Sequence, residues 1–101
     1  MGADFSQSKS VAVATADGVI GSSGVKGLVY AITVKGGTGS NTTTAKLYNG
    51  TGTGGTLQED AISPAKDTIT ISYGEKGVLY GSGIYLDITT TGGSVTVVYS
   101  Q

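Results

Sequence analysis

"GLVYAITVK", residues 27–35, alternates side chains of different size along its length. Successive side chains of a strand point to opposite faces of a sheet, so this segment has two distinct faces. The smaller residues of one face are Val29, Ala31 and Thr33. The bulkier residues of the other face are Leu28, Tyr30, Ile32 and Val34. This alternation predicts a half-buried strand of an antiparallel sheet, with the bulkier face in the core.

The same period of two recurs in "TITISY" (68–73), "GIYLDIT" (83–89) and "SVTVVY" (94–99). Branched and aromatic residues suit a pleated surface, and glycine-rich turn pairs such as Asn49-Gly50 separate the segments. Strands are expected near residues 10–16, 19–21, 27–35, 43–48, 56–59, 68–73, 78–80, 84–89 and 94–100. Their spacing predicts an all-β fold, an antiparallel β-sandwich of about eight short strands with a jelly-roll-like topology and essentially no helix.

The chain has 101 residues, which is enough for one domain. We expect residues 1–8 to form an N-terminal arm that is flexible or docks elsewhere, and residues 9–101 to form a single β-sandwich domain. Charged residues make up 13% of the chain, about half the usual share. Glycine, threonine and serine are abundant instead, so the outer faces are expected to be polar through hydroxyl groups.

Several functional classes are disfavoured by residues that the chain lacks. All six basic residues are lysine and none forms a basic stripe, so no nucleic-acid partner is expected. No apolar run is long enough for a membrane span, so no membrane partner is expected either. The chain has neither cysteine nor histidine, which removes thiolate ligands and the commonest general base. We therefore predict a protein that is not an enzyme and needs no cofactor and no metal.

One stretch, "GTGTGG" at residues 50–55, matches the phosphate-binding pattern G-x-G-x-x-G. That pattern works when a helix follows, because the helix N-terminus meets the phosphates. Here Pro64 follows within nine residues of Gly55, so no helix is expected. The stretch is better interpreted as a hairpin loop, exposed or reaching toward a neighbouring subunit, with Gly52 and Gly54 as candidate interface residues.

Three carboxylates, Glu59, Asp60 and Asp67, flank one predicted loop. Such residues are ligands for Ca²⁺, but their spacing resembles no known calcium loop. A hydrolase that uses a pair of carboxylates remains a remote alternative.

The six tyrosines are the other candidates for function. Tyr30 and Tyr73 share faces with aliphatic residues and are expected in the core. Tyr85 falls on the face opposite Ile84 and Leu86, and Tyr48 precedes the glycine loop. Exposed tyrosine is a common anchor in interfaces, so Tyr48 and Tyr85 are the candidate interface tyrosines.

An internal echo is also present, because "KGLVY" at 26–30 recurs as "KGVLY" at 76–80. Two related sheets would produce such a repeat. A restricted amino-acid alphabet would produce it by chance, which is the interpretation we favour.

"TTTAKLYNGTGTGGTLQ" (42–58) and "GVLYGSGIYLDITTTGGSVTVVYSQ" (77–101) resemble small all-β structural proteins encoded by tailed bacteriophages, especially phages of aquatic bacteria. The similar features are the "KLYNG" hairpin, the "GIYLD" strand and the closing "GSVTVVY" strand. This resemblance implies a virion component located at the capsid surface. It identifies strands and turns and carries no functional residues over.

The leading hypothesis is a capsid decoration (cement) protein that binds the major capsid protein on the outer surface of a phage head. Such proteins act as homo-oligomers, with a trimer favoured. The alternative is a glycan- or receptor-binding module of a head or tail fibre, in which Tyr48, Tyr80 or Tyr85 would line a groove.

Overall fold

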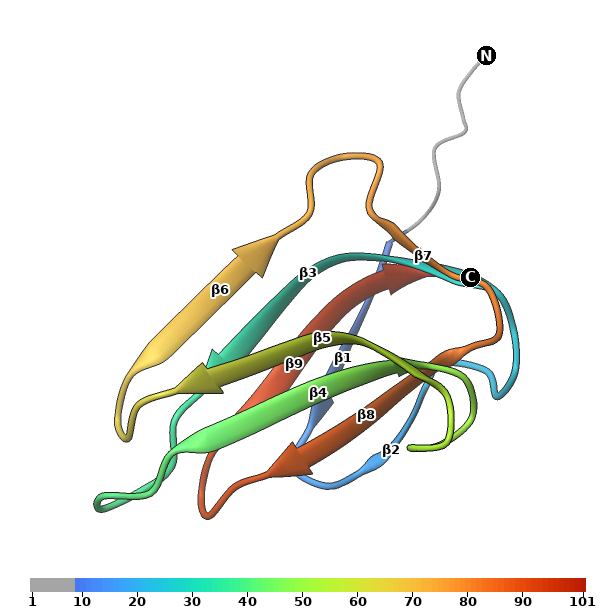
Figure 1. Ribbon diagram of the computed structural model, residues 1–101. Coiled ribbons are helices and arrows are strands. Elements are labelled where there is room, and N and C mark those ends of the chain that lie inside the picture. Colours follow the sequence, from blue (N-terminus) through green and yellow to red (C-terminus); the bar gives the residue numbers. More distant parts are fainter. Residues whose placement is uncertain (1–8) are drawn as a thin grey trace.

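The computed structural model describes residues 9–101, which form nine strands and no helix (Figure 1). The strands are β1 Ser10–Ala14, β2 Gly18–Ile20, β3 Gly27–Lys35, β4 Thr43–Asn49, β5 Thr56–Ser63, β6 Thr68–Ser72, β7 Val78–Tyr80, β8 Ile84–Thr89 and β9 Ser94–Ser100. The all-β prediction is confirmed for this part of the chain, with nine strands where about eight were expected. The predicted arm over residues 1–8 lies outside the described residues. Nor does the described part contain any helix of the length and apolarity that a membrane span needs.

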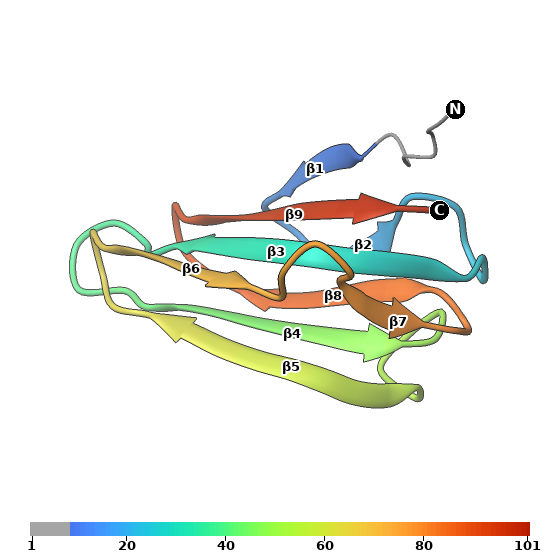
Figure 2. The ribbon, with the colours of Figure 1, turned by 90° about the horizontal axis from the view of Figure 1, so that it is seen from above.

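The strands form two antiparallel sheets that stack face to face (Figure 2). One sheet has the order β1-β9-β3-β6, with β7 also beside β3, and the other has the order β2-β8-β4-β5. Each strand of the first half pairs with a strand of the second half, namely β4 with β5, β3 with β6 and β7, β2 with β8, and β1 with β9. A long hairpin that is rolled up in this way is a jelly roll, as predicted.

The core lies between the sheets and comes from alternate residues of the central strands. The members whose side chains are fully buried are Val29, Ile32, Val34, Ala45, Leu47, Ile84, Leu86, Val95 and Val97. Burial of these apolar side chains is the main favourable contribution to folding, at about 25 cal/mol per Å² of apolar surface. The outward residues of the same strands are mostly threonine, serine and charged residues.

A β-bulge at Tyr30 changes which face of β3 is buried. Val29 is paired with Tyr99 of β9, but Ala31 is paired with the next residue, Val98, so Tyr30 is the extra residue. Because the bulge inverts the alternation, Val29 lies in the core while Leu28 is only half-buried. The predicted faces of Leu28 and Val29 were therefore wrong.

The two echo segments pair with each other. Gly27 of β3 lies opposite Tyr80 of β7, and Val29 lies opposite Val78. They are neighbours in one sheet and do not occupy equivalent places in two related sheets. The echo is thus no sign of duplicated halves.

The boundary of β5 was predicted too early, at residue 59. The strand continues to Ser63 because Ala61 and Ser63 pair with Ala45 and Thr43 of β4 and are buried with them. Tertiary pairing here outweighs a local sequence with two acidic residues.

We predict that Leu47→Ala lowers the free energy of unfolding by about 2–5 kcal/mol, because it leaves a cavity at the centre of the core. Leu57→Ala is the matched control, since Leu57 lies on the outer face of β5 with 44% of its surface exposed. Its expected cost is about 1 kcal/mol at most. Urea unfolding followed by circular dichroism measures both, and equal costs would contradict the observed faces.

Candidate functional site

Tyr48 and Tyr85 lie opposite each other on neighbouring strands, on the outer face of the β2-β8-β4-β5 sheet. Leu47 and Leu86 beside them in sequence point into the core, so both tyrosines point outward. Both rings are half-buried. The structure thus brings together the two tyrosines that the sequence singled out separately.

The pairing continues across the sheet on both sides. Val19 of β2 lies opposite Tyr85, and Leu57 of β5 lies opposite Tyr48. We call this set the tyrosine row; its members are Val19, Tyr85, Tyr48 and Leu57. Neighbouring strands are about 4.8 Å apart, so the row is a continuous apolar and aromatic strip across the whole sheet.

A charged strip runs beside the tyrosine row. Lys46 of β4 lies opposite Asp87 of β8 on one side and opposite Asp60 of β5 on the other. Lys46 and Asp87 are two positions along their strands from the row, about 7 Å away, and Asp60 is three positions from Leu57 because β5 has an extra residue there. The outer face of this sheet therefore offers flat rings for stacking beside alternating charges for hydrogen bonds.

The glycine loop between β4 and β5 is a hairpin, as predicted, and β5 follows it directly. Its base is held against the β7–β8 loop, because the Gly50 N–H donates to the Gly83 carbonyl (3.1 Å) and the Ser82 N–H donates to Asn49 Oδ1 (2.7 Å). No helix N-terminus faces the loop anywhere in residues 9–101, so the arrangement that cradles a phosphate is absent there.

The two candidate interface glycines differ from the glycines that the loop needs. A Cβ atom on Gly55 would collide with the Asn49 carbonyl, whereas Gly52 and Gly54 have open space where a Cβ atom would lie. The motif glycine at Gly55 is thus explained by close packing within the hairpin.

We predict that Gly52→Ala and Gly54→Ala change the free energy of unfolding by no more than about 0.5 kcal/mol. Gly55→Ala should cost about 1–3 kcal/mol, because the backbone of Asn49 has to move. Thermal unfolding of the three variants checks this. Similar losses at all three positions would show that the tip of the loop is as constrained as its base.

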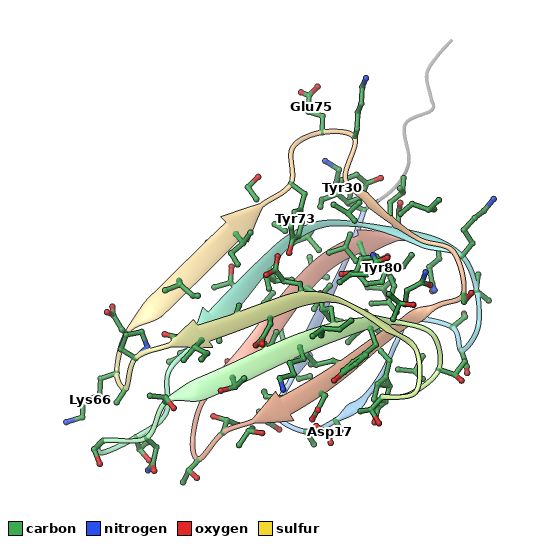
Figure 3. The ribbon with its side chains drawn as sticks, viewed as in Figure 1. Asp17, Tyr30, Lys66, Tyr73, Glu75 and Tyr80 are labelled. Atoms are coloured by element: carbon green, nitrogen blue, oxygen red, sulfur yellow. The ribbon has the colours of Figure 1, made fainter. Side chains whose placement is uncertain are left out.

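A second feature, which the sequence did not reveal, joins the two sheets at their open edge. A bulge at Gln58 of β5 places Glu59 opposite Leu47 and Leu57 opposite Tyr48, so Glu59 is directed between the sheets. The hydroxyl of Tyr73 donates a hydrogen bond to Glu59 Oε1 (2.5 Å). Figure 3 shows the Tyr73 side chain extending from the end of β6 toward β5.

A neighbouring contact reinforces this bond. Gln58 Nε2 donates to the carbonyl of Leu79 on β7 (3.1 Å). We call these two hydrogen bonds the edge latch, since they connect β5 of one sheet to the β6–β7 side of the other.

Two tyrosines beside the edge latch have raised pKa values, chiefly because they are buried. Burial, the hydrogen bond to Glu59 and the charge of Glu59 all raise the pKa of Tyr73 well above its ordinary value. Burial also raises the pKa of Tyr80 to about 12, with a smaller contribution from Glu59 and an opposing one from Gln58. A tyrosine that holds its proton so firmly is a poor general base.

The geometry bears on two further sets of candidate residues, Tyr80 and the three carboxylates. Tyr80 is only 1% exposed and lies in the core, so it cannot line a surface groove. Glu59, Asp60 and Asp67 do not converge, since Glu59 bonds Tyr73, Asp60 lies on the outer face and Asp67 Oδ1 accepts from the Thr68 N–H. Within residues 9–101 there is no cluster of three or more acidic, cysteine or histidine side chains able to hold a metal ion.

No known protein family, no curated protein and no solved structure matches this chain. Function is therefore inferred from the outer face of the β2-β8-β4-β5 sheet and from the edges of the two sheets.

We predict an alkaline loss of stability that originates in the buried tyrosines Tyr73 and Tyr80. An unfolded tyrosine ionises near pH 10, whereas Tyr80 in the fold ionises near pH 12 and Tyr73 holds its proton still more firmly. The folded state therefore binds more protons in this range, so its stability is complete below about pH 10 and falls as the pH rises toward 12.

Urea unfolding at a series of alkaline pH values measures this loss. Tyr73→Phe should make the decline in the free energy of unfolding shallower, because phenylalanine has no hydroxyl proton to lose. Tyr48→Phe, the same change on the outer face, is the matched control. An identical decline in wild type and Tyr73→Phe would contradict the role given to Tyr73.

Proposed function

We propose that this protein is a non-enzymatic structural component of a tailed-phage virion, a decoration protein that docks on the major capsid protein at the outer surface of the head. The observation that carries the proposal is the tyrosine row, with Tyr48 and Tyr85 side by side on an exposed sheet face. The resemblance of the hairpin and closing strands to phage structural proteins supports the same assignment.

The tyrosine row has the composition of a docking surface. Tyrosine supplies a large contact area with few rotatable bonds, and aromatic residues are enriched among the residues that dominate binding energy. Val19 and Leu57 extend the apolar strip at both ends. The charged strip of Asp87, Lys46 and Asp60 then fixes the orientation of a partner, because only complementary charges fit beside it.

Docking of this kind stabilises an assembled shell by mass action. A protein that binds the assembled lattice but not its separated subunits shifts the equilibrium toward the lattice. The jelly roll contributes a rigid sheet, so little conformational entropy is lost on binding. Each of the many copies on a lattice adds its own binding free energy to the stability of the shell.

A glycan-binding module of a head or tail fibre is the second candidate. It is favoured by the same pair of flat rings, on which sugar rings stack, beside carboxylates that accept hydrogen bonds from hydroxyl groups. The two candidates differ in copy number and in ligand, so they can be separated experimentally.

We predict that Tyr48→Ala with Tyr85→Ala weakens binding of the purified protein to phage heads that lack it by tenfold or more, since loss of one anchor typically costs more than about 1 kcal/mol. Leu79→Ala is the control, because Leu79 is exposed on the other sheet. Sedimentation of heads with labelled protein gives the affinity. Quantitative mass spectrometry of mature particles should find many copies per head.

Particles without the protein should lose infectivity sooner on heating or osmotic shock. Absence of the protein from mature virions would contradict the proposal. A handful of copies per particle, together with glycan binding that depends on Tyr48 and Tyr85, would favour the fibre module instead.

A further inference from the structure

The edge strand β1 carries the two most exposed large apolar side chains of residues 9–101. β1 pairs with β9 on one side, and no strand of residues 9–101 lies on its other side (Figure 2). Val11 and Val13 have the largest exposed fractions among the described large apolar side chains, at 64% and 67%. An edge strand of this kind presents unpaired backbone groups beside apolar side chains, which is a template for pairing with another strand.

The other edges are protected. β5 has a bulge at Gln58 and carries the edge latch, both of which disfavour regular pairing. β6 and β7 share one side of β3 but are interrupted by the loop that carries Glu75, which points away from the molecule (Figure 3). β2 has only three residues. Natural proteins block edges by these means, so the regular, uncharged edge of β1 stands out.

We propose that β1 pairs with β1 of a second copy of this chain, in an antiparallel, two-fold symmetric arrangement centred on Ala12. In this register Val11 of one copy lies opposite Val13 of the other, and the reverse pair is equivalent. Four valines would then adjoin on the outer face, where cross-strand pairs of branched side chains are favourable. The two β1-β9-β3-β6 sheets would become one continuous sheet.

Charge and symmetry favour a second copy as the partner. Residues 10–16 contain no charged side chain, so two β1 strands can approach without repulsion. Lys9 would lie opposite Thr15 of the other copy, away from its own counterpart. A two-fold contact uses the same edge on both copies and closes on itself, so the product is a dimer and not a fibre.

The dimer is expected to be weak in solution. Five residues on each side bury far less than the roughly 1,200 Å² of a standard stable interface. Pairing should therefore depend on concentration and be favoured where copies are held close together. It does not depend on the proposed function, because the tyrosine row lies on the other sheet. It also departs from the trimer expected by resemblance.

The register makes a charge test possible. Val11→Lys with Val13→Lys places lysine opposite lysine across the two-fold axis and should abolish the dimer. Val11→Lys with Val13→Glu places each lysine opposite a glutamate and should restore it. Both positions are largely exposed, so the fold should tolerate either pair. Ile62→Lys, an exposed change on β5 of the other sheet, is the control.

Sedimentation equilibrium over micromolar to millimolar concentrations measures the dimer, with circular dichroism as the check of folding. Wild type that is monomeric throughout, or trimeric, would overturn the proposal. So would a dimer that survives the lysine pair, or a folded lysine–glutamate variant that does not dimerise.

A crosslink gives an independent result. The chain has no cysteine, so Ala12→Cys introduces a single thiol that lies opposite itself in the proposed register. Mild oxidation should yield a covalent dimer for Ala12→Cys and little for Ser10→Cys, which would face Ala14 of the other copy. Equal crosslinking of the two variants would overturn the register.

Discussion

Leu47 of β4 and Leu86 of β8 are paired in register and fully buried between the sheets. Their burial forces the next residue of each strand outward, because side chains alternate along a strand. Tyr48 and Tyr85 are those next positions along the paired strands, so the aromatic pair on the surface is a direct consequence of the leucine pair in the core. A small domain has a narrow margin between burial and conformational entropy, and neither pair can be moved without the other.

Much of this architecture follows from local sequence. The alternation in residues 27–35, 84–89 and 94–100 indicates β3, β8 and β9 with the bounds that the structure has, since period and turn residues act within a few positions. The two bulges do not follow from it. The extra residues at Tyr30 and Gln58 arise from pairing with β9 and β4, which is not encoded in the local pattern. Local sequence therefore does not predict that Val29 faces the core in place of Leu28. Nor does it predict that Glu59 points between the two sheets.

The candidate site also follows from local sequence only in part. That Tyr48 and Tyr85 face outward could be derived from each strand alone, but that they adjoin depends on a register between distant segments. The glycine loop illustrates the opposite case, in which the local pattern does not show which glycines the packing requires. Gly55 is required by the approach of the Asn49 carbonyl, whereas Gly52 and Gly54 have free space around them.

The two proposed contacts use different parts of the molecule. The edge of β1 belongs to one sheet and the tyrosine row to the other, while the edge latch closes the side formed by β5 and β6. Two copies joined at β1 would hold two tyrosine rows at a fixed separation. On a surface with repeated binding sites, binding of the first tyrosine row raises the effective concentration of the second row at its own site. Two contacts that are weak by themselves then bind tightly together. A short, uncharged edge strand is then sufficient for assembly without making the free protein prone to aggregation.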